Sequence, residues 1–176
     1  MAILKIHYYG DPILEKPTTT INNITSKEIA LVEDMFETMF TAEGVGLAAN
    51  QVGINKRIVV IDASRGQMKK ERITIINPEI VFYSKEIDSG KEGCLSFPEM
   101  EGTVERSLLI GVRAVNLNGD TIELEVKDML ARIFQHEIDH LNGKMFIERM
   151  LRADRQLLEG KLKKLKKETL AHLKNK

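Results

Sequence analysis

The sequence predicts an α+β fold, in which mostly antiparallel sheets pack around one central helix, with a further helix near each end of the chain. Three observations lead to this prediction: a helical pattern over residues 25–42, a series of short β-type segments between residues 57 and 126, and a second helical pattern over residues 128–141. Strands that are grouped between separate helices, rather than alternating with them, are typical of antiparallel sheets.

The first helical pattern begins at Thr25. Thr25 and Glu28 have the spacing of a capping box, in which two side chains satisfy the free N–H groups of a helix start. Apolar residues then recur at three- and four-residue spacing, namely Ile29, Val32, Met35, Phe36 and Met39. We therefore expect a helix from Thr25 to Ala42.

Short apolar segments between the two helical patterns predict strands. They lie at residues 57–62, 73–76, 79–83, 103–106, 109–115 and 121–126. Asn77-Pro78 separates the second segment from the third, and proline cannot donate to a strand ladder. Asn118-Gly119, between the last two segments, is a strong signal for a tight hairpin turn.

The second helix is expected from Asp128 to Leu141, with Asn142-Gly143 ending it. It carries the pattern His-Glu-x-x-His, which places the imidazoles of His136 and His140 one above the other on one helix face. Such a pair can grip one metal ion, and the carboxylate of Glu137 can handle the protons of an attacking water. Two ordinary helix histidines remain the competing interpretation.

A catalytic metal of this kind has three protein ligands, so a third is needed. Cys94 is the only cysteine of the chain and cannot form an internal disulfide. It is a packed small residue, a nucleophile or a ligand, and buried free cysteines are common. Gly93 beside it and Pro98 beyond it indicate a turn with shaped backbone, which favours the ligand.

The glycine-rich run from Gly44 to Ala49 has two interpretations. It matches the dinucleotide fingerprint G-x-G-x-x-A, which follows a strand and opens a helix. Here the run follows a helical pattern, and the β-type segment 57–62 comes after it. That order is wrong for a nucleotide site, so we expect the glycines to let a substrate backbone approach closely.

Three motifs occur in one order: GVGLAANQ at 44–51, EGCLS at 92–96 and QHEIDHLNG at 135–143. Together they resemble the signature motifs of the peptide deformylases, and the likeness extends over most of the chain. The resemblance implies a hydrolase that removes the N-formyl group, as formate, from the formyl-methionine of new polypeptides. It implies that Cys94, His136 and His140 bind one Fe2+ per chain, with Zn2+, Ni2+ or Co2+ as substitutes.

The resemblance also implies roles for the neighbouring residues. Glu137 would be the general base and then the general acid, and Gln51 with the backbone N–H of Leu95 would bind the formyl oxygen. A pocket for the methionine side chain and the peptide backbone would be formed by Gly44, Val45, Gly46, Gly93, Met129 and Ile133. Plain core packing is the alternative for the last two of these.

Five charged residues near the motifs carry further expectations. By resemblance, Glu92 and Arg106 form an ion pair that braces the cysteine loop without touching the metal. Asp139 either orients a ligand or has a solvated or capping role. Glu101 and Arg132 depart from residues seen in some relatives, so we expect them to alter peptide preference or inhibitor affinity and not the metal chemistry.

Composition and length indicate one globular unit. The chain has 176 residues, 43% hydrophobic and 30% charged, and lacks an apolar run of the roughly 18 residues that span a bilayer. We expect residues 1–150 to form a single catalytic domain and residues 151–176 a helix of the same domain. The N-terminus lacks the apolar core of a signal peptide, and one free cysteine suits a reducing compartment, so we expect the cytoplasm.

The C-terminal segment is basic within a neutral chain. Residues 152–176 hold 9 Lys and Arg against 3 Asp and Glu, a net charge of +6. An apolar stripe runs along it, formed by Leu151, Leu158, Leu162 and Leu165. The stripe predicts docking on the domain, and the basic face predicts attraction to phosphate. The family resemblance implies a transient ribosome contact through this helix of a monomeric protein.

Two other functions fit part of the pattern. A small zinc endopeptidase shares His-Glu-x-x-His, but its third ligand is usually a downstream glutamate or histidine, whereas Cys94 lies upstream. A non-catalytic binding module with a structural metal would close the site with four protein ligands. Formate release from formyl-methionine peptides separates both from a deformylase.

Overall fold

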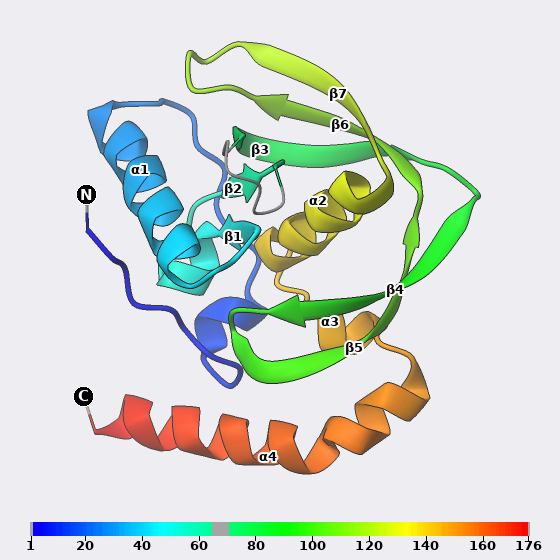
Figure 1. Ribbon diagram of the computed structural model, residues 1–176. Coiled ribbons are helices and arrows are strands. Elements are labelled where there is room, and N and C mark those ends of the chain that lie inside the picture. Colours follow the sequence, from blue (N-terminus) through cyan, green and yellow to red (C-terminus); the bar gives the residue numbers. More distant parts are fainter. Residues whose placement is uncertain (1, 65–70, 176) are drawn as a thin grey trace.

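The computed structural model of the protein describes residues 2–64 and 71–175. It has the predicted α+β architecture, with a central helix enclosed by two antiparallel sheets (Figure 1). The central helix, α2 (Asp128–Leu141), contacts β1, β2 and β3 of the larger sheet and β5 of the smaller one. Eleven of its 14 residues are buried, so its side chains face protein on all sides.

The larger sheet has five strands in the order β1-β2-β3-β6-β7. These are β1 (Gly46–Ala48), β2 (Ile58–Asp62), β3 (Arg72–Tyr83), β6 (Leu109–Val115) and β7 (Thr121–Lys127). Every pair is antiparallel, as predicted. The predicted turn joins β6 to β7, with Gly119 at φ +88°. The short β1 was not predicted.

The predicted break at Asn77-Pro78 was wrong, because β3 runs through it as one strand. Asn77 adopts φ +50°, and the pairing with β6 shifts register between Ile76 and Glu79. This irregularity accommodates a proline that has no N–H to donate. The Asn77 side chain bonds both backbone groups of Ile21, at 2.9 and 2.8 Å, which holds the bent strand against the segment before α1.

The smaller sheet is a hairpin of β4 (Ile87–Cys94) and β5 (Phe97–Ser107). The sequence predicted only residues 103–106 of it as a strand. Cys94 is the last residue of β4, and Leu95 and Ser96 form the turn. The register shifts between Gly93 and Cys94, so the expected shaped backbone at the cysteine is confirmed, within a hairpin.

Helix α1 (Ser26–Thr41) begins at Thr25 with the predicted capping box. Its apolar face packs on the larger sheet, where Val32, Met35 and Met39 share a cluster with β2 residues. The shorter helical elements are η1 (Pro12–Glu15), η2 (Ala49–Val52) and α3 (Phe146–Arg149). Helix α2 ends at Leu141, followed by Gly143 at φ +70°, as predicted.

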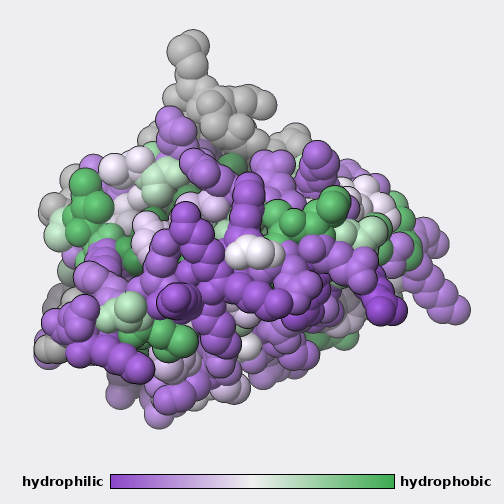
Figure 2. Space-filling view, turned by 90° about the horizontal axis from the view of Figure 1, so that it is seen from below, coloured by the Kyte–Doolittle hydropathy of each residue, from purple (hydrophilic) through white to green (hydrophobic). Residues whose placement is uncertain are grey.

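Helix α4 (Arg152–Lys174) lies along the outside of the molecule (Figure 1). Leu162 is buried, and Leu158 and Leu165 pack partly against the cluster that contains Phe97 and Phe146. Leu151, predicted in the same stripe, precedes the helix and is 42% exposed, so that prediction was wrong. The face seen from below in Figure 2 is largely hydrophilic, with separate apolar patches. Among the described residues, no helix has the length and apolarity to cross a membrane.

Candidate active site

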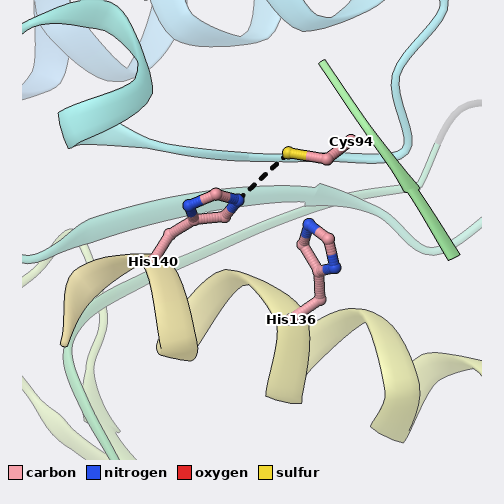
Figure 3. A group of neighbouring side chains, drawn as sticks. All are labelled: Cys94, His136 and His140. Carbon is pink, nitrogen blue, oxygen red and sulfur yellow. Dashed lines mark hydrogen bonds between the residues drawn. The ribbon is translucent and has the colours of Figure 1, made fainter. Parts of the chain in front are cut away.

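Three side chains converge between β4 and α2, namely Cys94, His136 and His140. One potential ligand atom from each residue lies within 4.8 Å of the other two, and Cys94 Sγ is 3.2 Å from His140 Nε2. Figure 3 shows the two rings rising from successive turns of α2 toward the sulfur. Metal bonds of about 2.0–2.3 Å put tetrahedral ligand atoms roughly 3.3–3.8 Å apart, so small movements would seat one ion.

The helix places both imidazoles because four residues make about one turn. The ring centroids of His136 and His140 are 5.0 Å apart, and both residues are buried. His136 Nδ1 lies 2.9 Å from Glu92 Oε2, which leaves Nε2 for a metal. A thiolate and two imidazoles are a donor set that suits Fe2+ or Zn2+. The residues present therefore fit a metal ion.

The electrostatics of this cluster follow from burial and close partners. Burial alone would lower the pKa of His136, but its hydrogen bonds to Cys94 and Glu92 raise it well above the ordinary value. Burial would raise the pKa of Glu92, but bonds from His136 and Arg106 hold it well below its ordinary range. Burial lowers the pKa of His140. Glu92 is therefore a carboxylate and His140 a neutral imidazole.

Glu137 follows the first histidine and lies against Gly46 of β1. A Cβ at Gly46 would come within 2.5 Å of Glu137 Oε1, so only glycine leaves room for the carboxylate. Glu137 Oε2 is buried without a hydrogen-bond partner among the described residues. Burial raises the pKa of Glu137 to about 7. A carboxyl group in this state can both accept and release a proton near neutral pH.

Gln51 is the last residue of the motif at 44–51 and comes from η2. Its Oε1 accepts the N–H of Ala48 at 2.8 Å, which fixes the orientation of the amide. Its Nε2 then lies 3.4 Å from Cys94 Sγ and 3.3 Å from Ser96 Oγ. The amide donor is thus held beside the proposed ligand sulfur, where Leu95 also lines the cavity.

A half-open cavity of about 540 Å³ lies beside this cluster. All six residues predicted for the substrate pocket line it: Gly44, Val45, Gly46, Gly93, Met129 and Ile133. Val45 is 41% and Met129 44% exposed, so neither is plain core, whereas Ile133 is buried. Ile6 and Tyr8 of the N-terminal segment also line the cavity. They were not predicted from the sequence, because they belong to no motif.

A buried charged network supports the helix from the side of β4 and β5. Arg106 bonds Glu92 at 2.9 and 3.0 Å and Asp139 at 2.5 Å. The predicted ion pair between Glu92 and Arg106 is confirmed. Asp139 also bonds Arg149, at 2.5 and 2.7 Å. The expected ligand-orienting, solvated or capping role of Asp139 was wrong, because its side chain is buried and bonds these two arginines.

The residue that contacts His136 is Glu92, which the sequence analysis assigned only to the ion pair with Arg106. A usable signal was present, since residues two apart on a strand share a face, and Glu92 stands two before Cys94. Arg132 was expected to alter peptide preference. It is buried against β4 and β5, although it also borders the cavity, and Glu101 lines the cavity as well.

Comparisons with known proteins agree with this site. The family model described as polypeptide deformylase matches residues 3–156. A peptide deformylase of Acidobacterium capsulatum is 42% identical over 167 residues, which cover 95% of this chain and 98% of the relative. That of Bartonella henselae is 46% identical over 158 residues, 90% of each chain.

Solved structures give the same result. A peptide deformylase from Plasmodium falciparum superposes with a TM-score of 0.91 at 39% identity, covering 95% of this chain and 98% of that one. One from Thermotoga maritima has a TM-score of 0.81 at 40% identity, covering 86% and 99%. The shared fold, the ordered motifs and the converging ligand set lead to one conclusion: this chain belongs to the peptide deformylase family of metal-dependent hydrolases that remove formyl groups.

Proposed function

We propose that Cys94, His136 and His140 hold the catalytic metal of this deformylase, and that Glu137 and Gln51 act on the formyl group of nascent formyl-methionine peptides. The observation that carries this proposal is the convergence of the three donor atoms within 4.8 Å, beside a cavity lined by Glu137. Family membership removes the support for an endopeptidase. Among the described residues, the only group that could hold a metal has three members, which does not suit a closed structural site.

A divalent ion at these ligands would lower the pKa of water to about 7 and so supply a hydroxide nucleophile at neutral pH. Glu137 accepts the proton that this water loses, and delivers it to the nitrogen as the formyl C–N bond breaks. The water oxygen leaves in formate, and the peptide keeps a free amine. The pKa of Glu137, which burial raises to about 7, suits both transfers.

Gln51 and the backbone N–H of Leu95 would donate to the formyl oxygen as negative charge develops on it. The Gln51 amide is already oriented by its bond from Ala48, so it need not reorganise during the reaction. Donors fixed in advance contribute the most to catalysis, and losing one such donor costs roughly 3–4 kcal/mol of activation free energy.

The methionine side chain would occupy the apolar part of the cavity, between Val45, Met129 and Ile133. The backbone of the peptide would lie along Gly44, Gly46 and Gly93, where the absence of side chains allows close approach. Apolar walls with a few oriented polar groups are typical of small-ligand sites.

The metal we propose is Fe2+, one per chain, with Zn2+, Ni2+ or Co2+ able to replace it. A thiolate among the ligands favours these softer ions over Mg2+ or Ca2+. Anaerobic purification followed by elemental analysis would identify the ion. An apo protein reconstituted equally well by Mg2+ would contradict the proposed ligand set.

The decisive experiment compares two substitutions. Glu137→Ala should keep one metal per chain and lose at least about 1,000-fold in kcat on formyl-Met-Ala-Ser, because the proton acceptor is gone. Cys94→Ala should instead lose the metal itself. Formate release and elemental analysis measure both outcomes, with Glu123→Ala on the exposed end of β7 as a control. Wild-type turnover in either of the first two variants would refute the mechanism.

We further infer that the enzyme works as a monomer in the cytoplasm and that α4 makes transient contact with ribosomal RNA. Residues 1–150 would be the catalytic unit, with residues 151–176 as a helix of the same domain. The docking of Leu162 in the core cluster supports the second point. The net charge of +6 over residues 152–176 supports the contact with phosphate.

A charge-matched pair of variants tests the ribosome contact. Replacing Lys163, Lys167 and Lys174 by glutamine should lower sedimentation with ribosomes about tenfold at low salt, because counterion release is lost. Turnover of formyl-Met-Ala-Ser should be unchanged. The control removes three exposed lysines elsewhere: Lys27, Lys85 and Lys127. Equal losses in both variants would indicate net charge alone and refute a site on α4.

A further inference from the structure

Arg132 lies on α2, one turn before the first histidine, and its guanidinium is buried between the helix and the β4–β5 hairpin. Its Nη1 donates to Glu92 Oε1 at 2.9 Å, to the backbone oxygen of Val104 at 2.8 Å and to that of Gly90 at 3.4 Å. Its Nη2 donates to the backbone oxygen and to the carboxylate of Asp88, at 2.8 and 3.1 Å. One side chain therefore connects α2 to both strands of the hairpin.

The hairpin is shaped around this guanidinium. A Cβ at Gly90 would come within 2.9 Å of Arg132 Cζ and 3.0 Å of Nη2, so the arginine occupies the space that a side chain on β4 would fill. Burying a cation is costly unless it is paired and hydrogen-bonded, and here the planar group meets acceptors on several sides. A substrate carboxylate would have to compete with those acceptors for the same N–H groups.

The contact with Glu92 connects the arginine to the metal site. Glu92 Oε1 accepts from Arg132 and Arg106, and Glu92 Oε2 lies 2.9 Å from His136 Nδ1. Arg106 also donates to Oε2, at 3.0 Å, so two arginines fix the carboxylate and Oε2 orients the imidazole. Partners of this kind fix the tautomer and direction of a ligand ring and often change metal affinity by about 10–100-fold.

The hairpin and helix also have to keep the right separation, because Cys94 comes from β4 whereas His136 and His140 come from α2. Arg106 connects the same elements through Asp139, on the following turns of α2. Arg132 does so one turn earlier, where it lines the cavity. The two arginines therefore hold α2 against the hairpin on both sides of His136.

We propose that Arg132 is a positioning residue for the metal centre: it fixes Glu92 against His136 and fixes the hairpin that carries Cys94 against α2. This inference rests on the proposed function, because it assigns Arg132 to the ligand geometry of that site. It replaces the expectation that Arg132 tunes peptide preference.

The test compares wild type with Arg132→Met, which keeps an unbranched apolar stem and removes the planar guanidinium. The dissociation constant for Co2+, measured on apo protein by competition with a chromophoric chelator, should rise about 10–100-fold. The visible spectrum of the Co2+ protein should shift, because the ligands change their angles. In metal-saturated enzyme, kcat on formyl-Met-Ala-Ser should fall about tenfold while KM stays within about twofold.

Two further variants distinguish the effect of the guanidinium geometry from the effects of lost charge and of failed folding. Arg132→Lys keeps the charge but lacks the planar set of N–H donors. Its Co2+ affinity should therefore lie between those of wild type and Arg132→Met. Gly90→Ala keeps the arginine and displaces its guanidinium, and should weaken Co2+ binding in the same direction by about threefold or more. Because Gly90→Ala leaves the buried partners in place, it serves even where Arg132→Met fails to fold. Arg113→Met, at an exposed ion pair, is the matched control.

The outcomes distinguish this inference from the proposed function. Wild-type protein that binds no divalent metal and releases no formate would refute the function itself. Active wild type with unchanged Co2+ affinity and spectrum in both Arg132→Met and Gly90→Ala would refute the positioning role alone. A rise in KM without a change in Co2+ affinity would mean that Arg132 contacts the peptide, which also overturns the inference.

Discussion

The helices α2 and α4 show how differently one chain uses its polar residues. Eleven of the 14 residues of α2 are buried, whereas Leu162 is the one buried residue of the 23 in α4. On α2, Gln135 bonds Ser107, His136 bonds Glu92 and Asp139 bonds two arginines. On α4, typical ion pairs such as Lys163 with Glu159 have partners that are 76% and 62% exposed.

The difference separates two kinds of recognition. A buried polar group must be partnered, so its position is fixed by several others at once, which is what a metal centre requires. A solvated charged side chain keeps its conformational freedom and contributes to the electrostatic potential of the surface. Such a potential suits contact with a phosphate backbone of any sequence. We therefore expect substitutions on the α2 side to be severe and those on α4 to be mild.

The largest expected effect is that of Glu92→Gln, which breaks the network beside α2. The substitution leaves Arg106 and Arg132 buried with one negative partner fewer and removes the carboxylate beside His136. Removing one member of a buried ion pair costs about 3–5 kcal/mol. Urea unfolding of the metal-free protein, with a chelator present, measures the loss without any contribution from metal binding.

The control for Glu92→Gln is Glu123→Gln, in a pair with Arg113 whose side chains are 55% and 69% exposed. Exposed pairs of this kind contribute at most about 1 kcal/mol. Similar losses of unfolding free energy in the two variants would show that burial does not separate them, and the contrast between the two helices would lose its basis.

A smaller effect is expected where α4 docks on the domain. Leu162 is 7% exposed and packs in the cluster with Phe97 and Phe146, whereas Leu157 on the same helix is 84% exposed. Leu162→Ala should lower the free energy of unfolding by about 2–4 kcal/mol, through lost burial and a cavity. Leu157→Ala should change it by no more than about 0.5 kcal/mol. If Leu157→Ala lowered the free energy of unfolding as much as Leu162→Ala, residues outside the apolar stripe would also stabilise the docking of α4.

The local features of the fold were readable from the sequence. The capping box at Thr25, the helix end at Gly143 and the turn at Gly119 each depend on residues within a few positions of one another. The spacing of His136 and His140 belongs to the same class, because one helical turn brings the rings together. For these features, the predictions and the structure agree.

Features that depend on distant segments were missed. Glu92 and His136 are 44 residues apart, and Arg132 reaches β4 across a similar separation. No periodicity encodes such a pairing, because it depends on how the hairpin lies against α2. The predicted strand break at Pro78 was wrong for a related reason. A bulge and the bonds of Asn77 to Ile21 override the local preference of proline for the end of a strand. Gly93 and Pro98 made Cys94 a candidate ligand, but only the family resemblance linked it to the histidines, because its spacing from them carries no local signal.

The smallest expected effect is a pH dependence at the start of α1, where the partners are neither enclosed as on α2 nor as free as on α4. Bonds from Lys56 and then Thr25 lower the pKa of Glu28 to about 2, from an ordinary value of 4.5. Because the folded state prefers the carboxylate, the stabilisation is complete above pH 4.5 and is lost as the pH falls toward 2.

Glu28→Gln keeps the capping-box pattern and removes only the charge. The difference in unfolding free energy between wild type and this variant should therefore be constant from pH 7 to pH 5.5 and should shrink from pH 4.5 to pH 3. Urea unfolding at each pH measures it. A difference that grows with acidity would require a raised pKa in the folded state, which contradicts the bonds that Glu28 makes with Lys56 and Thr25.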